Sequence, residues 1–303
     1  SSMWKTLIAI FFLLVGIGMP SVFALSLDYP AIFRLSERPA AGAATTIPVD
    51  AAPAPRAFVE NGISALRLAC PFQSTTFGRS AWDIPVRADL RFSGGIRFKI
   101  RVSNLSSFGY FTFYFKSGGG WYVHEFSVTG EGEWETVRVR KADTRIEGNP
   151  GGWRNISAFR VSAWRGDGSS ATLDIAGFGL LSGRSELVVV RGTTGFQSLP
   201  AGEKKSRLLY PRRVADLLTN YGLEPLIVDE SDLDRDILRS AKVLILPYNP
   251  ALTISQAQSI SEFVERGGRL VGFYTVPGAL SDRIGLRATG AIRAAEVPGG
   301  FSA

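Results

Sequence analysis

The 303-residue sequence is poor in cysteine and histidine, with one of each, Cys70 and His124. A single thiol excludes a disulfide within the chain, and a single imidazole excludes a Cys/His zinc cluster or a site that needs two imidazoles. Charged residues are also sparse, at 20%, whereas hydrophobic residues make up 45%. This composition excludes a disordered or collagen-like chain. At roughly 100 to 200 residues per domain, the length predicts two domains.

The net charge of +7 has no concentrated source. Residues 25–183 carry 18 basic and 14 acidic side chains, and residues 184–303 carry 15 and 13. Proteins that bind nucleic acids usually gather Lys and Arg into a stripe that displaces counterions from phosphates. Here Lys and Arg gather only in two short clusters, at residues 204–207 and 212–213. We therefore expect a solvated surface and no nucleic-acid partner.

The N-terminal segment has the order of features found in a signal peptide. Lys5 precedes an apolar run from Leu7 to Met19, followed by Pro20 and the small-residue stretch that ends at Ala24. A membrane-spanning helix needs about 20 apolar residues, and this run is shorter. We predict a signal peptide over residues 1–24, cleaved near Ala24, and a secreted or periplasmic protein. The alternative is an uncleaved membrane anchor.

Residues 25–57 form an N-terminal segment that ends in a Pro/Ala-rich linker, and a strand-rich region, 58–183, follows. The candidate strands are ALRLACPF, GIRFKIRV, YFTFYF, WYVHEFSV, WETVRVRK, ISAFRVSAW and TLDIAGFGLL. Turn residues separate these strands, and no helical pattern interrupts them. The pattern predicts a β-sandwich of the jelly-roll type.

Alternation along these strands separates a core face from an outer face, because successive side chains of a strand point to opposite sides. Phe111, Phe113 and Phe115 share the predicted core face. The outer face receives aromatic and basic side chains that suit a glycan, and our candidates are Arg97, Tyr110, Tyr114, Trp121, Arg160 and Trp164. Two alternatives stay open: this face docks against the second domain, or it is ordinary surface.

The strand-rich region contains two further side chains that could bind a metal or take part in chemistry, Asp174 and His124. Asp174 is a weak candidate for a structural Ca²⁺ site, since one carboxylate rarely suffices. His124 alternates with apolar neighbours and is expected to be a packed strand residue. No other cofactor is predicted.

The pattern changes over residues 184–303, where apolar strands alternate with helical segments. Strands ELVVVRG, PLIVD, KVLILPY and RLVGFY are joined by three helical stretches, which predicts a parallel sheet with right-handed crossovers. We expect the first helix to start at Pro211 and to end before Gly222. Ser231 is expected to cap the second helix, and Thr253 or Ser255 the third.

This second region resembles the class I glutamine amidotransferase-like α/β fold. The resemblance rests on the segments LIVDESDL, KVLILPYNPALT, FVERGG and RLVGFYTVPGAL. In that family a Cys follows the last of these strands, and Tyr274 stands in its place here. Thioester chemistry needs a thiolate and a nearby base, so amidotransferase activity is not expected. Loops after parallel strands often bind ligands. The crevice candidates are Asp229, Glu230, Tyr248, Asn249 and Tyr274, although a neighbouring element could equally cover such a crevice.

The strand-rich region resembles galactose-binding-like or carbohydrate-binding-module sandwiches, on GWYVHEFSV, NPGGWRNISAFRVS and TLDIAGFGL. The combination resembles the N-terminal region of bacterial family 10-like glycosyl hydrolases, whose catalytic barrel is absent from this sequence. The α/β region also shows four strands where five or more are expected, so we hypothesise that the chain is an N-terminal fragment of a longer protein.

The resemblance implies an exported, non-catalytic, carbohydrate-associated pair of modules. Its expected partners are a polysaccharide or oligosaccharide and a downstream catalytic domain. One alternative is a structural scaffold that forms a homo-oligomer without binding glycans. The other is a hydrolase that uses paired carboxylates such as Asp229 and Glu230, which need about 5 to 9 Å between them.

Overall fold

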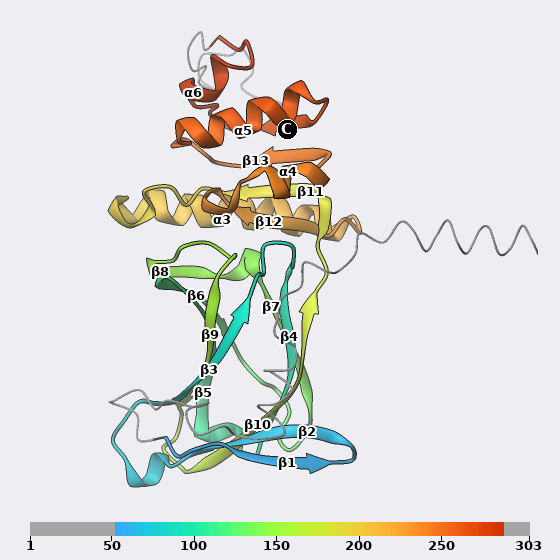
Figure 1. Cartoon of the computed structure of the whole chain (residues 1–303). Helices are drawn as coiled ribbons and strands as arrows, with labels where there is room; N and C mark the ends of the chain where they lie inside the picture. The colour runs from blue at the N-terminus through green and yellow to red at the C-terminus, as the bar shows by residue number, and fades with distance from the viewer. Residues whose placement is uncertain (1–51, 288–303) are drawn as a thin grey trace, which may run out of the picture.

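The computed structural model describes residues 52–287. The predicted signal peptide and residues 288–303 lie outside that range. The described chain forms a β-sandwich, and a smaller α/β unit is stacked on one end of it (Figure 1). No helix in this range is both long and apolar enough to cross a membrane.

The sandwich consists of two five-stranded antiparallel sheets. Sheet 1 has the order β1 (Arg56–Glu60), β2 (Ile63–Cys70), β10 (Ala171–Leu181), β4 (Gly95–Val102) and β7 (Glu135–Arg140). Sheet 2 has the order β3 (Arg79–Ala88), β9 (Ile156–Arg165), β5 (Phe108–Ser117), β6 (Gly119–Phe126) and β8 (Arg145–Asn149). The predicted sandwich architecture is therefore present.

An aromatic core fills the space between the two sheets, as the alternation predicted. Phe111, Phe113 and Phe115 of β5 are buried in it. Phe113 lies 5.2 Å from Phe98 of β4 and 5.3 Å from Phe159 of β9, measured between ring centroids. Both ring pairs are tilted, and their centroid distances fall within the range of aromatic pairs that stabilise a core beyond the area that they bury.

Three strands of the sandwich were not predicted: β1, β3 and β8. In β3 the obstacle was Pro85, which argues against a central strand because it lacks an N–H for the ladder. The structure places β3 at the edge of sheet 2, paired with β9 alone. An edge strand tolerates proline, so this position explains the missed prediction.

The α/β unit contains a parallel sheet, sheet 3, in the order β12 (Pro225–Asp229), β11 (Arg184–Arg191), β13 (Val243–Leu246) and β14 (Arg269–Gly272). Helix α3 (Ala201–Asn220) packs on one face. Helices α4 (Arg235–Ser240), α5 (Ile254–Glu265) and α6 (Gly278–Ser281) pack on the other. Both faces are thus covered, as parallel sheets require.

The predicted helix ends are partly wrong. Helix α3 begins at Ala201, ten residues before the predicted start, and Pro211 lies inside it. Its N-terminal half buries Arg207, so it carries no apolar stripe that a pattern search would detect. Asp234, and not Ser231, caps α4. The Thr253 cap of α5 is confirmed and forms a complete capping box with Gln256.

Candidate functional site

Two clusters of aromatic and basic side chains lie on the outer face of sheet 2. The first, the Trp121 cluster, consists of Tyr114, Lys116, Trp121 and Arg160. The Cζ atom of Arg160 lies 4.3 Å from the Trp121 ring centroid, and Lys116 Nζ lies 4.7 Å from the same point. Tyr114 meets this ring edge-on at 5.8 Å. The indole therefore has two cations within the range of cation–π attraction.

The second group, the Trp164 cluster, consists of Arg79, Tyr110, Thr112 and Trp164. The Tyr110 and Trp164 rings stack with centroids 5.2 Å apart and an interplanar angle of 13°. The indole Nε1 of Trp164 donates to Thr112 Oγ1 at 2.9 Å, and Arg79 Cζ lies 5.2 Å from the indole centroid. The hydrogen bond and the stacking hold the indole in one orientation.

Strand register brings each cluster together. Tyr110 pairs with Trp164, Tyr114 pairs with Arg160, and Lys116 pairs with Trp121 across neighbouring strands. Arg160 also donates to Asp83 on β3, from Nη2 to Oδ2 at 2.8 Å. Residues that are paired across strands share a face. The clusters are therefore a direct result of the β3–β9–β5–β6 order.

Of the six candidates for sugar contact, five lie on this face. The exception is Arg97, which belongs to β4 of sheet 1 and lies beside Gly179. Alternation showed that Arg97 points away from the core, but it could not show which sheet would contain its strand. The structure thus separates Arg97 from the other five candidates.

Asp174 is placed in an ion-pair network on sheet 1. Its carboxylate accepts from Arg67 Nε at 2.8 Å and from Arg101 Nη2 at 2.8 Å, and it is almost fully buried. Both oxygens already serve guanidinium groups, so the calcium prediction is not supported by the geometry. No group of three or more His, Cys, Asp or Glu side chains placed to hold a metal occurs within residues 52–287.

Asp229, a crevice candidate, lies instead at the junction of the two domains. Arg191 Nε donates to Asp229 Oδ1 at 2.7 Å, and the hydroxyl of Tyr122 in the sandwich donates to Oδ2 at 2.7 Å. All three side chains are buried. Burial, followed by the Asp229 charge, raises the pKa of Tyr122, which stays protonated as the donor. Asp229 therefore joins the domains and does not line an open crevice.

Two further buried charged residues, Lys141 and Asp232, lie at the same junction. Lys141 Nζ donates to the carbonyls of Leu90 and Arg91 at 3.0 and 3.1 Å. Asp232 accepts from the backbone N–H of Trp153 at 2.8 Å. Burial lowers the pKa of Lys141 to about 7 and raises the pKa of Asp232 to about 7. Such shifts follow from the desolvation of charged groups.

Glu230 and Asn249 are brought together at the carboxyl end of sheet 3. Asn249 Nδ2 donates to Glu230 Oε1 at 2.8 Å, and the Thr194 N–H donates to Glu230 Oε2 at 2.8 Å. Glu230 and Asn249 are both buried. Neither Glu230 nor Asp229 has a free carboxylate facing solvent, which weighs against the paired-carboxylate hydrolase.

Tyr248 and Tyr274 form an aromatic group with Tyr210, in which Tyr274 is exposed and the other two rings are partly buried. The Tyr210–Tyr274 centroids lie 4.8 Å apart, and Tyr248 donates to Glu203 Oε2 at 3.0 Å. Tyr274 has φ of 65°, which is the left-handed region and is uncommon for a bulky residue. Backbone strain of this kind persists only where the surrounding structure holds it.

Three residues of the junction were not predicted from the sequence: Tyr122, Lys141 and Arg191. Arg191 did carry a signal, because it ends the apolar strand that begins ELVVV, and a cation there needs a carboxylate partner. Lys141 and Tyr122 carried none, since their burial depends on how the domains pack. His124, as predicted, is a packed strand residue; it stacks with Phe126 at 6.2 Å, and burial lowers its pKa.

No family model and no curated protein matches this chain. Solved structures that are similar include the family 11 carbohydrate-binding module from Clostridium thermocellum in complex with a β-1,3-1,4-mixed-linked tetrasaccharide. It has 14% identity and a TM-score of 0.34, and the match covers 48% of this chain and 93% of that one.

Two glycoside-acting enzymes are also similar in part. An exo-β-agarase has 11% identity and a TM-score of 0.34, with 61% of this chain and 30% of that chain covered. A β-galactosidase from Bifidobacterium adolescentis has 19% identity and a TM-score of 0.27, with 34% and 54% covered. The chain thus spans about half of the β-galactosidase. Likenesses at this level assign no family to the chain.

Proposed function

We propose that the outer face of sheet 2 binds a polysaccharide or oligosaccharide through the Trp121 and Trp164 clusters. The observation that carries this proposal is the presence of two separate ring-and-cation clusters on one sheet face. The C–H faces of sugar rings pack against aromatic side chains, while basic and acidic side chains such as Arg160 and Asp83 hydrogen-bond their hydroxyls. Two such clusters suit an extended glycan better than a single ring.

The placement of the α/β unit supports this use of the face. The junction uses Tyr122, Lys141 and Trp153 at one end of the sandwich. Among the described residues, no hydrogen bond, ion pair or ring contact joins Tyr110, Tyr114 or Trp164 to the α/β unit. Docking of the α/β unit therefore does not use Tyr110, Tyr114 or Trp164.

Affinity electrophoresis in gels that contain soluble plant, algal or bacterial polysaccharides tests the proposal. We expect retardation on at least one polysaccharide, and at least about tenfold weaker binding in Trp121→Ala and Trp164→Ala, because a lost stacking contact of 1.4 kcal/mol has that effect. Trp134→Ala is the matched control, because it removes a partly exposed indole that lies away from sheet 2. The Trp134 ring contacts the guanidinium of Arg101, a residue of sheet 1. No retardation on any polysaccharide, or equal weakening by all three variants, would refute the assignment.

We also propose that the α/β unit is an amidotransferase-like fold without its thiol, and that it acts as structural support. The left-handed backbone of Tyr274 supports this proposal, because a sharp turn at this position is what a nucleophile elbow requires. The buried Arg191–Asp229–Tyr122 contact supports the structural role. A glutaminase assay in which the chain shows turnover would contradict it.

We further propose export of the protein through the predicted signal peptide, in keeping with a carbohydrate partner outside the cell. The test is expression of the chain in a bacterium, followed by fractionation and mass spectrometry of the N-terminus. We expect a mature protein that begins near Leu25, whereas an intact N-terminus in the membrane fraction would favour the uncleaved anchor.

A further inference from the structure

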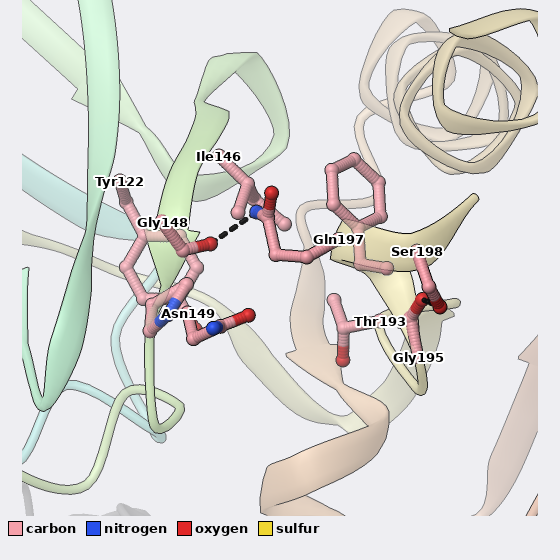
Figure 2. Close-up of a pocket in the computed structure, with 10 residues that line it drawn as sticks. Tyr122, Ile146, Gly148, Asn149, Thr193, Gly195, Gln197 and Ser198 are labelled. Atoms are coloured by element: carbon pink, nitrogen blue, oxygen red, sulfur yellow. Dashed lines mark hydrogen bonds between the residues drawn. The ribbon is translucent and has the colours of Figure 1, made fainter. Parts of the chain in front are cut away.

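A pocket of about 270 Å³ lies at the junction of the two domains. Figure 2 shows the residues that line it. One side belongs to the sandwich and is formed by β6 and β8 with the turn that follows β8. The other side is the loop after β11 in the α/β unit. The lining residues are Tyr122, Ile146, Gly148, Asn149, Pro150, Thr193, Gly195, Phe196, Gln197 and Ser198. Clefts between domains are common ligand sites.

The lining contains no acidic and no basic side chain. Its polar groups are the two amides of Asn149 and Gln197 and the two hydroxyls of Thr193 and Ser198. The rest is apolar or aromatic, with Phe196 and Tyr122 contributing rings. A charged ligand would find no counter-ion here and would lose its hydration. The chemistry of the wall therefore favours a neutral molecule that donates and accepts hydrogen bonds.

The Tyr122 wall of the pocket is rigid. The Tyr122 ring stacks on Trp153 with centroids 4.0 Å apart and an interplanar angle of 9°. Its hydroxyl is held by Asp229 at 2.7 Å. A ligand that enters the pocket meets a surface that is already ordered, so little binding free energy is lost in fixing it.

Several polar groups of the pocket have unused hydrogen-bonding capacity. Thr193 Oγ1 is buried and has no partner. Asn149, the last residue of β8, lines the pocket, and its amide has no hydrogen-bond partner within the described residues. Gln197 is exposed, and its Nε2 donates to the carbonyl of Gly148 on the opposite wall (Figure 2). A buried hydroxyl without a partner costs free energy that a ligand would recover.

We propose that this pocket binds one neutral sugar ring through hydrogen bonds from Asn149, Thr193 and Gln197. Its volume lies just below the range of drug-sized sites, about 300 to 1,000 Å³, which suits one ring and not an extended chain. The ring comes from a free monosaccharide or from the end of a glycan. The inference rests on a carbohydrate partner, as does the proposed function, but it uses other residues.

Isothermal titration calorimetry of the purified protein tests the pocket. The probes are four neutral monosaccharides (glucose, galactose, mannose and xylose), the charged sugars glucuronate and glucose 6-phosphate, and a neutral disaccharide and tetrasaccharide. We expect binding of at least one neutral monosaccharide and weaker binding of its charged counterpart. Tighter binding of the oligosaccharides than of the monosaccharide identifies a chain end as the source of the ring, and the reverse identifies the free sugar.

The variants separate this site from the sheet 2 surface. Asn149→Ala and Gln197→Ala are expected to weaken monosaccharide binding at least about tenfold. Gln258→Ala is the matched control, because Gln258 is an exposed residue of α5 bonded to Glu262.

The inference is overturned if no neutral monosaccharide binds, if the charged sugars bind as tightly, or if Asn149→Ala and Gln197→Ala bind like the unmodified protein. Circular dichroism of each variant shows whether it is folded. Retardation on a polysaccharide without binding of any neutral monosaccharide would overturn the pocket and leave the sheet 2 surface standing. Monosaccharide binding that is lost in Asn149→Ala, without retardation on any polysaccharide, would support the pocket and overturn the sheet 2 surface.

Discussion

Removal of one hydroxyl at the domain junction is the sharpest test of how the two domains are held together. Tyr122→Phe deletes the donor that lies 2.7 Å from Asp229 Oδ2 and leaves the ring that stacks on Trp153 at 4.0 Å. The packing is therefore preserved, and the variant isolates the hydrogen bond. Asp229 retains Arg191, whose Nε and Nη2 lie 2.7 and 3.2 Å from its two oxygens.

The expected loss of unfolding free energy is ~2 kcal/mol, since hydrogen bonds to charged groups contribute about 1.5 to 3 kcal/mol each. Loss of the whole ion pair would lower the unfolding free energy further, because an unpaired buried charge costs about 3 to 5 kcal/mol. The retained Arg191 contacts keep Tyr122→Phe below that figure. Asp229→Ala, which leaves Arg191 buried without its partner, should reach it.

Urea denaturation followed by circular dichroism measures both variants. Tyr221→Phe is the matched control, because Tyr221 is 79% exposed at the end of α3, and its stability should match that of the unmodified protein within about 0.5 kcal/mol. If Tyr122→Phe falls within the same margin, the buried hydroxyl does not contribute as argued, and the account of the junction is wrong.

Three further changes give measurable outcomes. Thr253→Ala removes the capping box shared with Gln256 and should lower stability by about 1 kcal/mol in urea denaturation, whereas no change would mean that the cap is dispensable. Burial raises the pKa of the Cys70 thiol to about 12, so a thiol reagent at pH 8 should label it only after unfolding, and rapid labelling of the native protein would contradict its burial. Folding raises the pKa of Asp232, so the native state binds more protons than the unfolded state below pH 7. Folding lowers the pKa of Lys141, so the native state binds fewer protons than the unfolded state above pH 7. Stability relative to a Lys141→Met/Asp232→Asn variant should fall from about pH 4 to pH 7 and rise from pH 7 to about pH 10, as measured by urea denaturation, and a flat profile would disprove the shifts.

The faces of the sandwich strands were predictable because alternation is a local property. Phe113 and Tyr114 are neighbours in sequence, and a strand must send them to opposite sides. The core position of Phe113 and the outward position of Tyr114 beside Arg160 follow from that rule. The edge strand β3 was not predictable, since only its position in the sheet makes Pro85 acceptable.

In the α/β unit, too, features set by nearby residues were predictable and features set by distant contacts were not. Local chemistry predicted the Thr253 cap and the turn at Gly222, which has φ of 75°. The start of α3 was wrong because the helix packs partly through Arg207, whose Nη1 donates to the carbonyl of Thr194. A buried arginine looks like a surface residue until its carbonyl and carboxylate partners are known.

The sequence by itself determined the two kinds of domain, the faces of the strands and the absence of a thiol where Tyr274 stands, since each depends on residues near one another along the chain. Only the tertiary structure decided that Asp229 binds Tyr122 across the junction, that Arg97 lies apart from Trp121, and that a neutral pocket lies between the domains. The physical reason is that burial and pairing depend on contacts between residues about a hundred positions apart. The periodicity of a strand or helix shows which face a residue lies on, but it does not show which distant residue it contacts.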